Sequence, residues 1–422
     1  MPDKTVILGA GAAGIGTAYA LRKKGTDPVV YEQDADWGGL CGNFTIDGFR
    51  FDRFVHFTFA NDPETAKLFE ESSPLYGHPS VSYNYWRGYW LKHPVQNNLA
   101  PLPIDEKVKI IESFVNRAHK EEDDIKDYGE WLRVQYGDYF AENFPFLYTR
   151  KYWGREAEKL ATGWIGKRMQ SLPLSEILRG AFAEPEENFY YLKRMNYPKQ
   201  GGFRSIFDIA RQGVDIRFNK KATRIDTTAK TVFFADGTAE KYEKLVSTIP
   251  LPLMAEIVDN CPADVKAAAD DLHWTCGYQV SFGFNRPDIA KHLWFYIYDH
   301  DMPPARVYSP NLKAADNVPA GCSALQAEVF FDNQAKIPDA DDILRKTETC
   351  LKKICGFTDT DIAVKDIRFE PYANVVFTLG IYKNRAIVRD WLEQAGIITV
   401  GRFGKWDYLW SHQAFETGRE AA

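Results

Sequence analysis

The sequence lacks several features that mark common classes of protein. Its six cysteines include no CxxC pair and no spacing typical of a zinc site, so no metal site is expected. Cysteines spread in this way are typical of reduced thiols in a cytoplasmic protein. No apolar run reaches the roughly 18 residues that a membrane-spanning helix needs, so no membrane span is expected. The first expected strand begins at residue 4, which leaves no room for a secretory signal peptide.

Positive charge does not dominate the chain either. The formal net charge is −6, which argues against a nucleic-acid partner. No clear Glu/Asp dyad for general acid–base catalysis stands out. Aromatic residues, by contrast, make up 14% of the sequence, which indicates either a packed core or stacking surfaces for a flavin, a base or a sugar. A length of 422 residues favours about two to three domains.

Residues 4–32 are the most informative stretch. A short apolar segment leads directly into Gly9-Ala10-Gly11-Ala12-Ala13-Gly14, and helical spacing and a second apolar segment ending at Glu32 follow. This order is typical of the strand–turn–helix–strand unit that binds a dinucleotide. Gly9 permits the tight turn, Gly11 lets the backbone approach a pyrophosphate, and Gly14 lets helix and strand pack closely. Glu32 is placed to accept a hydrogen bond from a ribose hydroxyl.

Two other glycine-rich segments allow a structural and a functional interpretation. The segment Trp37-Gly38-Gly39-Leu40-Cys41-Gly42 either approaches the bound dinucleotide or forms an ordinary hairpin turn. The segment Gly401–Tyr408 follows an expected buried strand and precedes an expected helix. It either closes over the cofactor at the positive end of that helix or is a plain strand-to-helix turn.

The order of segments predicts an α/β fold with a discontinuous Rossmann-type domain, a helical insertion domain and an antiparallel β-sheet domain. The Rossmann-type domain is expected from residues 1–62, 197–260 and 396–422, and strands near 215–249 are expected to return to its sheet. Residues 63–165 are expected to form the mostly helical substrate-binding domain. The antiparallel β-sheet substrate domain is expected from residues 166–196 and 261–395.

Five stretches occur in an order that resembles a known family, and they span nearly the whole chain: His93–Asn98, Tyr148–Trp153, Trp164–Arg168, Tyr197–Gly202 and Gly401–Tyr408. The family is that of UDP-galactopyranose mutase, closest to its eukaryotic-type branch, within the FAD-dependent amine-oxidase-like superfamily. The resemblance implies a flavoprotein whose Rossmann-type domain binds FAD. It also implies an isomerase that interconverts the pyranose and furanose forms of UDP-galactose or a related NDP-sugar, with reduced FAD as the nucleophile.

The same resemblance implies partners and a biological setting. The substrate is a nucleotide-sugar, most simply a UDP-sugar, and NAD(P)H or another reductant primes the flavin. A homo-oligomer is compatible with the family, and the implied role is in cell-surface polysaccharide biosynthesis.

The resemblance assigns the cofactor contacts residue by residue. His56, in the segment Val55–Asp62, matches a histidine beside the isoalloxazine, although a histidine in an apolar context is more often a satisfied core residue. The other implied FAD contacts are Gly9, Gly11, Gly14, Glu32, Gly38, Gly39, Ala222, Gly401, Arg402 and Gln413.

The resemblance also assigns substrate contacts. Arg168 and Arg306 match the two arginines that clamp the diphosphate, where a guanidinium donates in a fixed fork and stays charged. Without the resemblance, either arginine is better interpreted as part of a surface salt bridge. The remaining implied substrate contacts are Gln96, Asn97, Trp153, Tyr372 and Tyr408.

The chain departs from the family pattern at several positions, and two rival functions stay open. His93 and Val95 stand where the eukaryotic pattern has tyrosine and phenylalanine, Thr149 stands where asparagine is frequent, and residues 373–380 replace a proline-rich loop. One rival is an FAD-dependent oxidoreductase of the amine oxidase or protoporphyrinogen oxidase type. The other is a nucleotide-sugar-binding protein without turnover.

Overall fold

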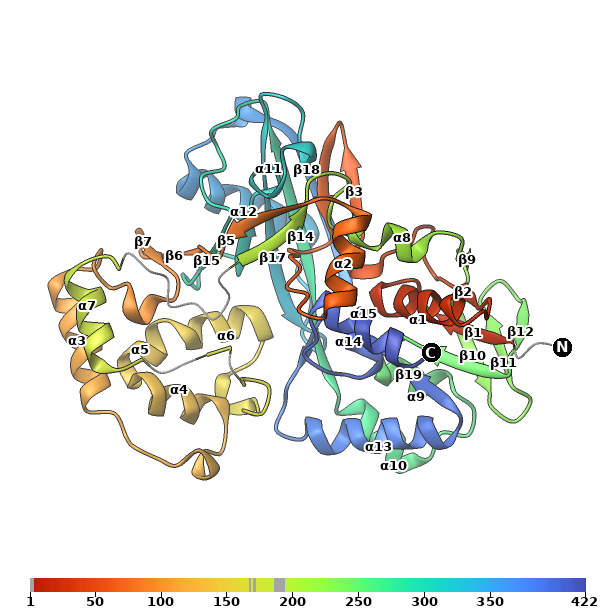
Figure 1. Cartoon of the computed structure of the whole chain (residues 1–422). Helices are drawn as coiled ribbons and strands as arrows, with labels where there is room; N and C mark the ends of the chain where they lie inside the picture. The colour runs from red at the N-terminus through yellow and green to blue at the C-terminus, as the bar shows by residue number, and fades with distance from the viewer. Residues whose placement is uncertain (1–3, 167, 170–171, 186–193) are drawn as a thin grey trace.

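The protein has three parts that lie side by side in space: a parallel sheet, a long mixed sheet and a helical region (Figure 1). The computed structural model describes residues 4–166, 168–169, 172–185 and 194–422. Lys167, which belongs to the 164–168 stretch quoted above, lies outside the described residues, as do parts of the expected segment 166–196. In Figure 1 the helical region lies on the left and the parallel sheet on the right, with the long strands β14, β17 and β18 between them.

The parallel sheet draws its strands from distant parts of the sequence. Its order is β19-β13-β1-β2-β9, and every neighbouring pair is parallel. The strands are β1 (Thr5–Leu8), β2 (Val29–Tyr31), β9 (Asp215–Arg217), β13 (Lys244–Ser247) and β19 (Ile397–Thr399). Central strand β1 is buried throughout because its residues are apolar or, like Thr5, β-branched. The discontinuous Rossmann-type sheet is therefore confirmed, and we propose residues 1–62, 197–260 and 396–422 as the bounds of its domain.

Two helices pack closely beside this sheet. Helix α1 (Ala12–Lys23) follows the glycine turn, and helix α15 (Ser411–Glu420) lies against it. A Cβ atom on Gly418 would lie only 2.0 Å from the carbonyl oxygen of Ala13, so the two backbones can approach this closely only because Gly418 has no side chain. This contact brings the C-terminal end of the chain to the N-terminal glycine turn.

The segment 215–241 departs from the expected arrangement. Strands β10 (Ala222–Asp226), β11 (Thr231–Phe234) and β12 (Ala239–Lys241) form a separate antiparallel sheet. The prediction that all strands near 215–249 return to the parallel sheet is wrong, because only β9 and β13 join it. Short turns join β10, β11 and β12, and strands so closely linked pair antiparallel, whereas neighbours in a parallel sheet need a long crossover.

The long mixed sheet has the order β18-β14-β17-β16-β15-β6-β7. Its strands are β6 (Tyr83–Trp86), β7 (Tyr89–Lys92), β14 (His273–Phe284), β15 (Trp294–Ile297), β16 (Arg306–Tyr308), β17 (Ser323–Asp332) and β18 (Ile362–Val376). All neighbours are antiparallel except β15 and β6. The expected antiparallel sheet is thus largely confirmed, with one parallel pair, β15 and β6, next to the terminal β6–β7 hairpin.

Residues 75–92 are strands, although the sequence predicts mostly helix from residue 63 onward. Strands β6 and β7 form a hairpin whose turn residues Arg87 and Gly88 have φ angles of +49° and +88°. Positive φ at both central residues is typical of the type I′ turn that joins twisted strands. The tyrosines and tryptophans on either side favour strands, so the helical prediction fails there for a local reason.

The remaining elements cover these sheets. The helical region contains α3 (Ile104–Val115), α4 (Tyr128–Tyr136), α5 (Asp138–Asn143), α6 (Pro145–Trp153) and α7 (Leu174–Phe182). The other helices are α2 (Pro63–Ser72), α8 (Asp208–Arg211), α9 (Leu251–Ile257), α10 (Ala263–Asp270), α11 (Pro310–Lys313), α12 (Ala340–Cys355), α13 (Ile381–Gln394) and α14 (Gly401–Gly404). The remaining strands are β3 (Asn43–Ile46), β4 (Phe49–Asp52), β5 (Leu75–Pro79) and β8 (Arg194–Pro198). None of the helices in the described ranges has the length and apolar character to cross a membrane.

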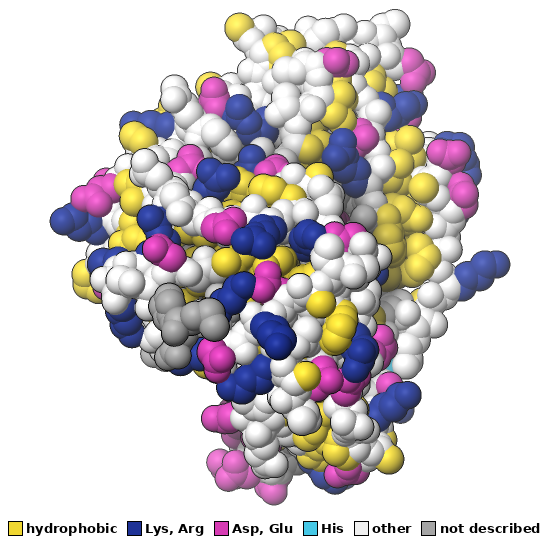
Figure 2. All heavy atoms as spheres, turned by 90° about the vertical axis from the view of Figure 1, so that its right-hand side faces the viewer, with side chains coloured by type: hydrophobic (Ala, Val, Ile, Leu, Met, Phe, Trp, Pro, Cys, Tyr) yellow, Lys and Arg dark blue, Asp and Glu magenta, His cyan; other side chains and the backbone are white. Residues whose placement is uncertain are grey.

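The surface seen in Figure 2 carries charges of both signs. Lysine and arginine side chains alternate there with aspartate and glutamate, and no large area of that face has a single sign. This mixture agrees with the net charge of −6 and gives the phosphate backbone of a nucleic acid no basic stripe on that face.

Candidate cofactor and substrate site

The first two glycine segments form one cradle at the carboxyl end of β1. The amide of Gly9 donates to the carbonyl oxygen of Tyr31 at 2.8 Å, and the amide of Gly38 donates to that of Ala10 at 2.9 Å. A Cβ atom on Gly14 would lie 1.9 Å from the carbonyl oxygen of Gly9, so only glycine fits where the helix meets the turn. The second glycine segment therefore lies against the first, as a site for one extended dinucleotide requires.

The acidic residue at the end of β2 closes this cradle. Glu32 is buried, and its carboxylate accepts hydrogen bonds from the amides of Ala10 at 2.7 Å and Asp34 at 3.0 Å. Burial raises the pKa of Glu32, and the two backbone donors oppose that rise. The amide of Lys220 donates to the carbonyl oxygen of Glu32 at 2.7 Å, which brings the chain just before Ala222 beside the same edge.

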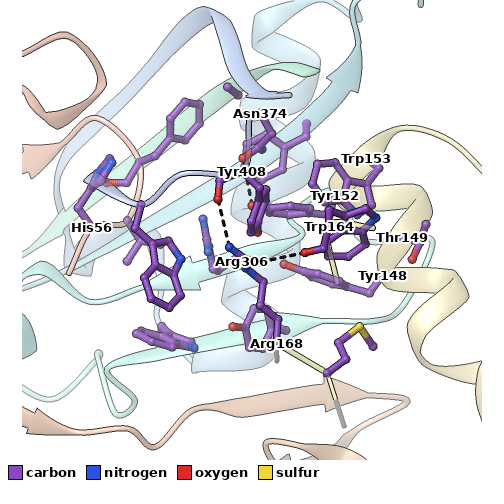
Figure 3. A pocket seen from close by; sticks show the side chains of 18 of the residues that line it. His56, Tyr148, Thr149, Tyr152, Trp153, Trp164, Arg168, Arg306, Asn374 and Tyr408 are labelled. Carbon is purple, nitrogen blue, oxygen red and sulfur yellow. Dashed lines mark hydrogen bonds between the residues drawn. The ribbon is translucent and has the colours of Figure 1, made fainter. Parts of the chain in front are cut away.

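A cavity of about 340 Å³ lies between the long sheet, the helical region and the C-terminal segment (Figure 3). Its wall is largely aromatic, with contributions from α6, β15 and the segment before α15. Leu40, which follows the second glycine pair, also lines it, so the cavity adjoins the glycine cradle. The aromatic lining residues are Phe54, Phe57, Phe59, Tyr128, Tyr148, Tyr152, Trp153, Trp164, Trp294, Tyr296, Tyr298, Phe330, Tyr408 and Trp410.

Three arginines bring positive charge to this aromatic cavity. Arg168 donates through Nη1 to the carbonyl oxygen of Trp164 at 2.8 Å and through Nη2 to that of Tyr408 at 3.1 Å (Figure 3). Its guanidinium carbon lies 4.4 Å from the centre of the Tyr408 ring. Arg402 donates to the side-chain oxygen of Asn374 at 3.2 Å. Within the described parts of the chain, neither Arg168 nor Arg402 has a carboxylate within 4.0 Å, so their two charges are not neutralised there.

The third arginine has a carboxylate partner. Nε of Arg306 donates to Oε2 of Glu328 at 2.6 Å, and Glu328 is fully buried. Burial lowers the pKa of Arg306, but the nearby Glu328 carboxylate outweighs this effect, and the net shift is upward. Arg306 therefore stays charged at every practical pH. The structure brings Arg168 and Arg306 to the same cavity from two different parts of the chain.

His56 lines the cavity as a neutral imidazole. Burial lowers the pKa of His56 to about 4. Its Nδ1 lies 3.2 Å from the carbonyl oxygen of Phe54, and its ring stacks on Phe203 with centroids 5.0 Å apart. A carbonyl oxygen can only accept, so Nδ1 carries the proton and Nε2 is left as an acceptor.

The other predicted contacts divide into two groups. Trp153 and Tyr408 line the cavity, and the centroids of their rings lie 5.9 Å apart. Tyr372, Gln96 and Asn97 are not among the described residues that line it. Tyr372 stacks on Trp274 instead, at 5.0 Å, while its strand neighbours Ala373 and Asn374 face the cavity.

The remaining predicted cofactor residues lie at the C-terminal segment. A Cβ atom on Gly401 would lie 2.7 Å from Cβ of Ala13, so Gly401 sits against the start of α1. Gln413 accepts a hydrogen bond from the amide of Trp410 at 2.9 Å and so caps α15.

Sequence reasoning missed several residues of this site. Tyr148 and Tyr152 lie one helical turn apart on α6 and face the cavity, a spacing visible in the sequence. The sequence also contains a sign of Glu328: apart from Gln326, the other residues of 324–331 are apolar, and an unpaired charge in such a segment would be costly. Its partner Arg306, however, is 22 residues away in the sequence, and only strand pairing reveals the contact.

The comparisons with known proteins agree with this geometry. A protein-family model described as flavin containing amine oxidoreductase matches residues 12–422. The chain belongs to this family of flavin-containing amine oxidoreductases. Its cofactor is FAD.

Several solved structures share the fold. A reduced UDP-galactopyranose mutase superimposes with a TM-score of 0.91 at 22% identity, covering 99% of this chain and 94% of that one. A putative protoporphyrinogen oxidase from Exiguobacterium sp. 255-15 gives 0.76 at 17% identity, covering 100% and 98%. Putrescine oxidase bound to putrescine gives 0.67 at 16% identity, covering 99% and 97%. Identities this low show a shared fold only.

Curated relatives match short segments of the chain. An uncharacterized protein in the nifH2 3′ region of Methanothermococcus thermolithotrophicus is 42% identical over 66 residues, which are 15% of this chain and 64% of that protein. The inactive all-trans-retinol 13,14-reductase of Danio rerio is 41% identical over 54 residues, which are 12% of this chain and 9% of that protein. The chain therefore spans less than two thirds of the length of either relative.

The residues at the cradle and the cavity fit FAD. The two glycine segments leave an open backbone surface: a Cβ atom on Gly11 would meet only the carbonyl oxygen of Gly38, at 3.9 Å. Beside the cavity, Nε of Arg402 and Oγ of Ser411 are buried and have no hydrogen-bond partner among the described residues. An open cradle at one end and unsatisfied polar atoms at the other suit an elongated, partly polar cofactor.

Proposed function

We propose that this chain is a flavin-dependent nucleotide-sugar mutase that interconverts the pyranose and furanose forms of UDP-galactose or a related NDP-sugar. The observation that carries the proposal is the pairing of Arg168 and Arg306 on an aromatic cavity beside the flavin cradle. The fold similarity to a reduced UDP-galactopyranose mutase supports it, as do the family-ordered stretches of the sequence.

The charge of the cavity favours an anionic ligand. Arg306 and Glu328 together are close to neutral, whereas Arg168 and Arg402 each add an uncompensated positive charge. A diphosphate is the ligand chemistry that suits such a site, because its parallel oxygens accept from guanidinium forks. The terminal nitrogens of Arg306 remain available for this, since within the described residues its hydrogen bond to Glu328 uses only Nε.

We assign roles to the lining residues accordingly. Bound FAD, in its reduced form, supplies the nucleophile that a redox-neutral exchange at the anomeric carbon needs. Arg168 and Arg306 bind the diphosphate and stabilise the charge that develops when it leaves. Trp153, Trp164 and Tyr408 exclude water, which protects a reactive sugar from hydrolysis.

His56 and the glycine cradle act on the cofactor side of the proposed site. Neutral His56 offers its Nε2 as a hydrogen-bond acceptor. We propose that the cradle of Gly9, Gly11, Gly38 and Gly39 holds the pyrophosphate of FAD. Glu32 would then bind the ribose through a carboxylate that the turn already positions.

A second candidate is an FAD-dependent oxidoreductase of the amine oxidase or protoporphyrinogen oxidase type. The family match and the fold shared with putrescine oxidase favour it. An aromatic cavity suits a cationic amine, but the uncompensated charges of Arg168 and Arg402 would repel one. The electrostatics therefore favour the nucleotide-sugar over a cationic amine.

One experiment separates these functions. The purified, FAD-loaded protein is reduced with dithionite and incubated with UDP-galactopyranose and a panel of other UDP- and dTDP-sugars, and the products are resolved by chromatography. The mutase produces furanose isomers only with reduced flavin. Hydrogen peroxide release with an amine or a porphyrinogen would establish the oxidase instead, and binding of a UDP-sugar without any product would leave a binding protein.

A further inference from the structure

Three neighbouring strands place a row of buried polar side chains behind the cavity. Gln279 on β14 pairs across the sheet with Glu328 on β17, and Glu328 pairs with Arg306 on β16. Cross-strand partners project from the same face of a sheet, so the three side chains follow one another. Gln279 and Glu328 are both fully buried.

The two buried members of this row hold the backbone just before His56. The side-chain oxygen of Gln279 accepts from the amide of Phe54 at 3.0 Å, and Oε1 of Glu328 accepts from the amide of Val55 at 2.7 Å. Oε2 of Glu328 accepts from Nε of Arg306. One carboxylate therefore bonds the loop of His56 with one oxygen and the arginine of the cavity with the other.

The backbone that these bonds hold is strained. Phe54 has a φ angle of +63°, in the left-handed region that a bulky residue rarely adopts. Such a conformation persists only where the surroundings over-determine it. The carbonyl oxygen of Phe54 in turn accepts from Nδ1 of His56, so the imidazole depends on this same turn.

We propose that Glu328 is a positioning residue that couples anion binding at Arg306 to the strained turn of His56. The inference rests on the proposed function, because it takes a nucleoside diphosphate as the anion. When the diphosphate binds the terminal nitrogens of Arg306, the guanidinium shifts toward it, and Glu328 carries the shift to the amide of Val55. The environment of the flavin then reports whether the substrate site is occupied.

The test uses the FAD-loaded protein and UDP as the probe. UDP is titrated into the wild type, and its binding is followed by calorimetry and by the visible difference spectrum of the flavin. In Glu328→Gln the amide oxygen still accepts from Val55, but the charge that links it to Arg306 is gone. We expect this variant to bind UDP within about ten-fold of the wild-type Kd and to lose at least half of the difference-spectrum amplitude.

A matched control comes from the same strand. Asp332 lies on β17 four residues beyond Glu328 and forms an ion pair with Arg155, and neither residue lines the cavity. Asp332→Asn removes the same charge from the same strand and should leave the difference spectrum unchanged. A merely structural role for Glu328 would lower the melting temperature of Glu328→Gln without this spectral change.

The outcomes are distinct. UDP binding to Glu328→Gln with the full wild-type difference spectrum would overturn the coupling and leave the proposed function intact. Loss of the spectrum in Asp332→Asn as well would also overturn it, because the effect would not be specific to Glu328. No binding of UDP to the wild type would overturn the proposed function, and the coupling with it.

Discussion

Arg168 offers the sharpest single perturbation of the proposed site. In Arg168→Ala the diphosphate loses a guanidinium fork that can donate two charge-assisted hydrogen bonds, each contributing about 1.5–3 kcal/mol. The sum of about 3–6 kcal/mol corresponds to a loss of roughly 10²–10⁴ in kcat/KM. The stability of the fold should fall by less, because within the described residues the hydrogen bonds of Arg168 are two part-buried ones to the carbonyl oxygens of Trp164 and Tyr408. We expect a fall in Tm of a few degrees, from about 1–2 kcal/mol.

The assay measures three quantities on one preparation: furanose formation from UDP-galactopyranose, the Kd of UDP, and the ratio of 450-nm flavin absorbance to protein. Arg150→Ala is the matched control, since Arg150 lies on α6 and pairs with Glu156 at the surface, outside the described lining of the cavity. We expect Arg168→Ala to keep its yellow flavin while turnover and UDP binding fall. The reasoning is refuted if UDP binds Arg168→Ala as tightly as the wild type, or if the variant purifies without flavin.

Three further predictions concern the cradle, a buried ion pair and pH. Gly11→Ala should lose FAD while its FAD-free form keeps nearly the Tm of the FAD-free wild type, because the added Cβ meets only the Gly38 carbonyl oxygen, at 3.9 Å. Gly14→Ala should have a clearly lower Tm in the FAD-free form, because its Cβ would lie 1.9 Å from the carbonyl oxygen of Gly9. Equal Tm values for the two FAD-free variants would contradict this. Lys313→Met leaves the buried Asp52 carboxylate without its cation, so it should lower the free energy of unfolding, measured with urea, by about 3–5 kcal/mol. Lys23→Met, in the exposed pair with Glu64, should lower it by less than about 1 kcal/mol. Burial lowers the pKa of His56 to about 4, below the roughly 6.5 of an unfolded histidine, so wild-type stability falls as pH drops from 6.5 toward 4. Between pH 6.5 and 5 the free energy of unfolding of His56→Phe should fall by about 2 kcal/mol less than that of the wild type. If the free energy of unfolding depends on pH in the same way in both proteins, this explanation is wrong.

Local patterns in the sequence predict the cofactor half of the site well. The strand–turn–helix unit of residues 4–32 is contiguous in the sequence. Its glycines are required by contacts between residues close in the sequence, such as that of Gly14 with Gly9. The sequence also indicates that the second glycine segment lies near the first, because few residues separate it from Glu32. The helical prediction for residues 63–165 does not hold at the aromatic hairpin 83–92, although the Arg87-Gly88 pair at its turn is visible in the sequence.

The substrate half could be predicted only through resemblance. Arg168 and Arg306 lie far apart in the sequence, and only the packing of the helical region on the long sheet brings both to one cavity. The placement of Tyr372 depends on an irregularity in β18, where the register with β14 shifts between the Thr275–Asn374 and Gly277–Glu370 pairs. At this irregularity the side chain of Tyr372 stacks on Trp274, while Ala373 and Asn374 both line the cavity. Register of this kind depends on tertiary contacts that spacing alone does not encode.

The claim that the flavin acts in a redox-neutral isomerisation is tested most directly by counting turnovers. The reduced, FAD-loaded protein is held under strictly anaerobic conditions with excess UDP-galactopyranose, and furanose product and flavin absorbance are recorded together. We predict many product molecules per flavin while the flavin stays reduced throughout. Absence of isomerised product, or product limited to one equivalent with matching reoxidation of the flavin, would contradict the account.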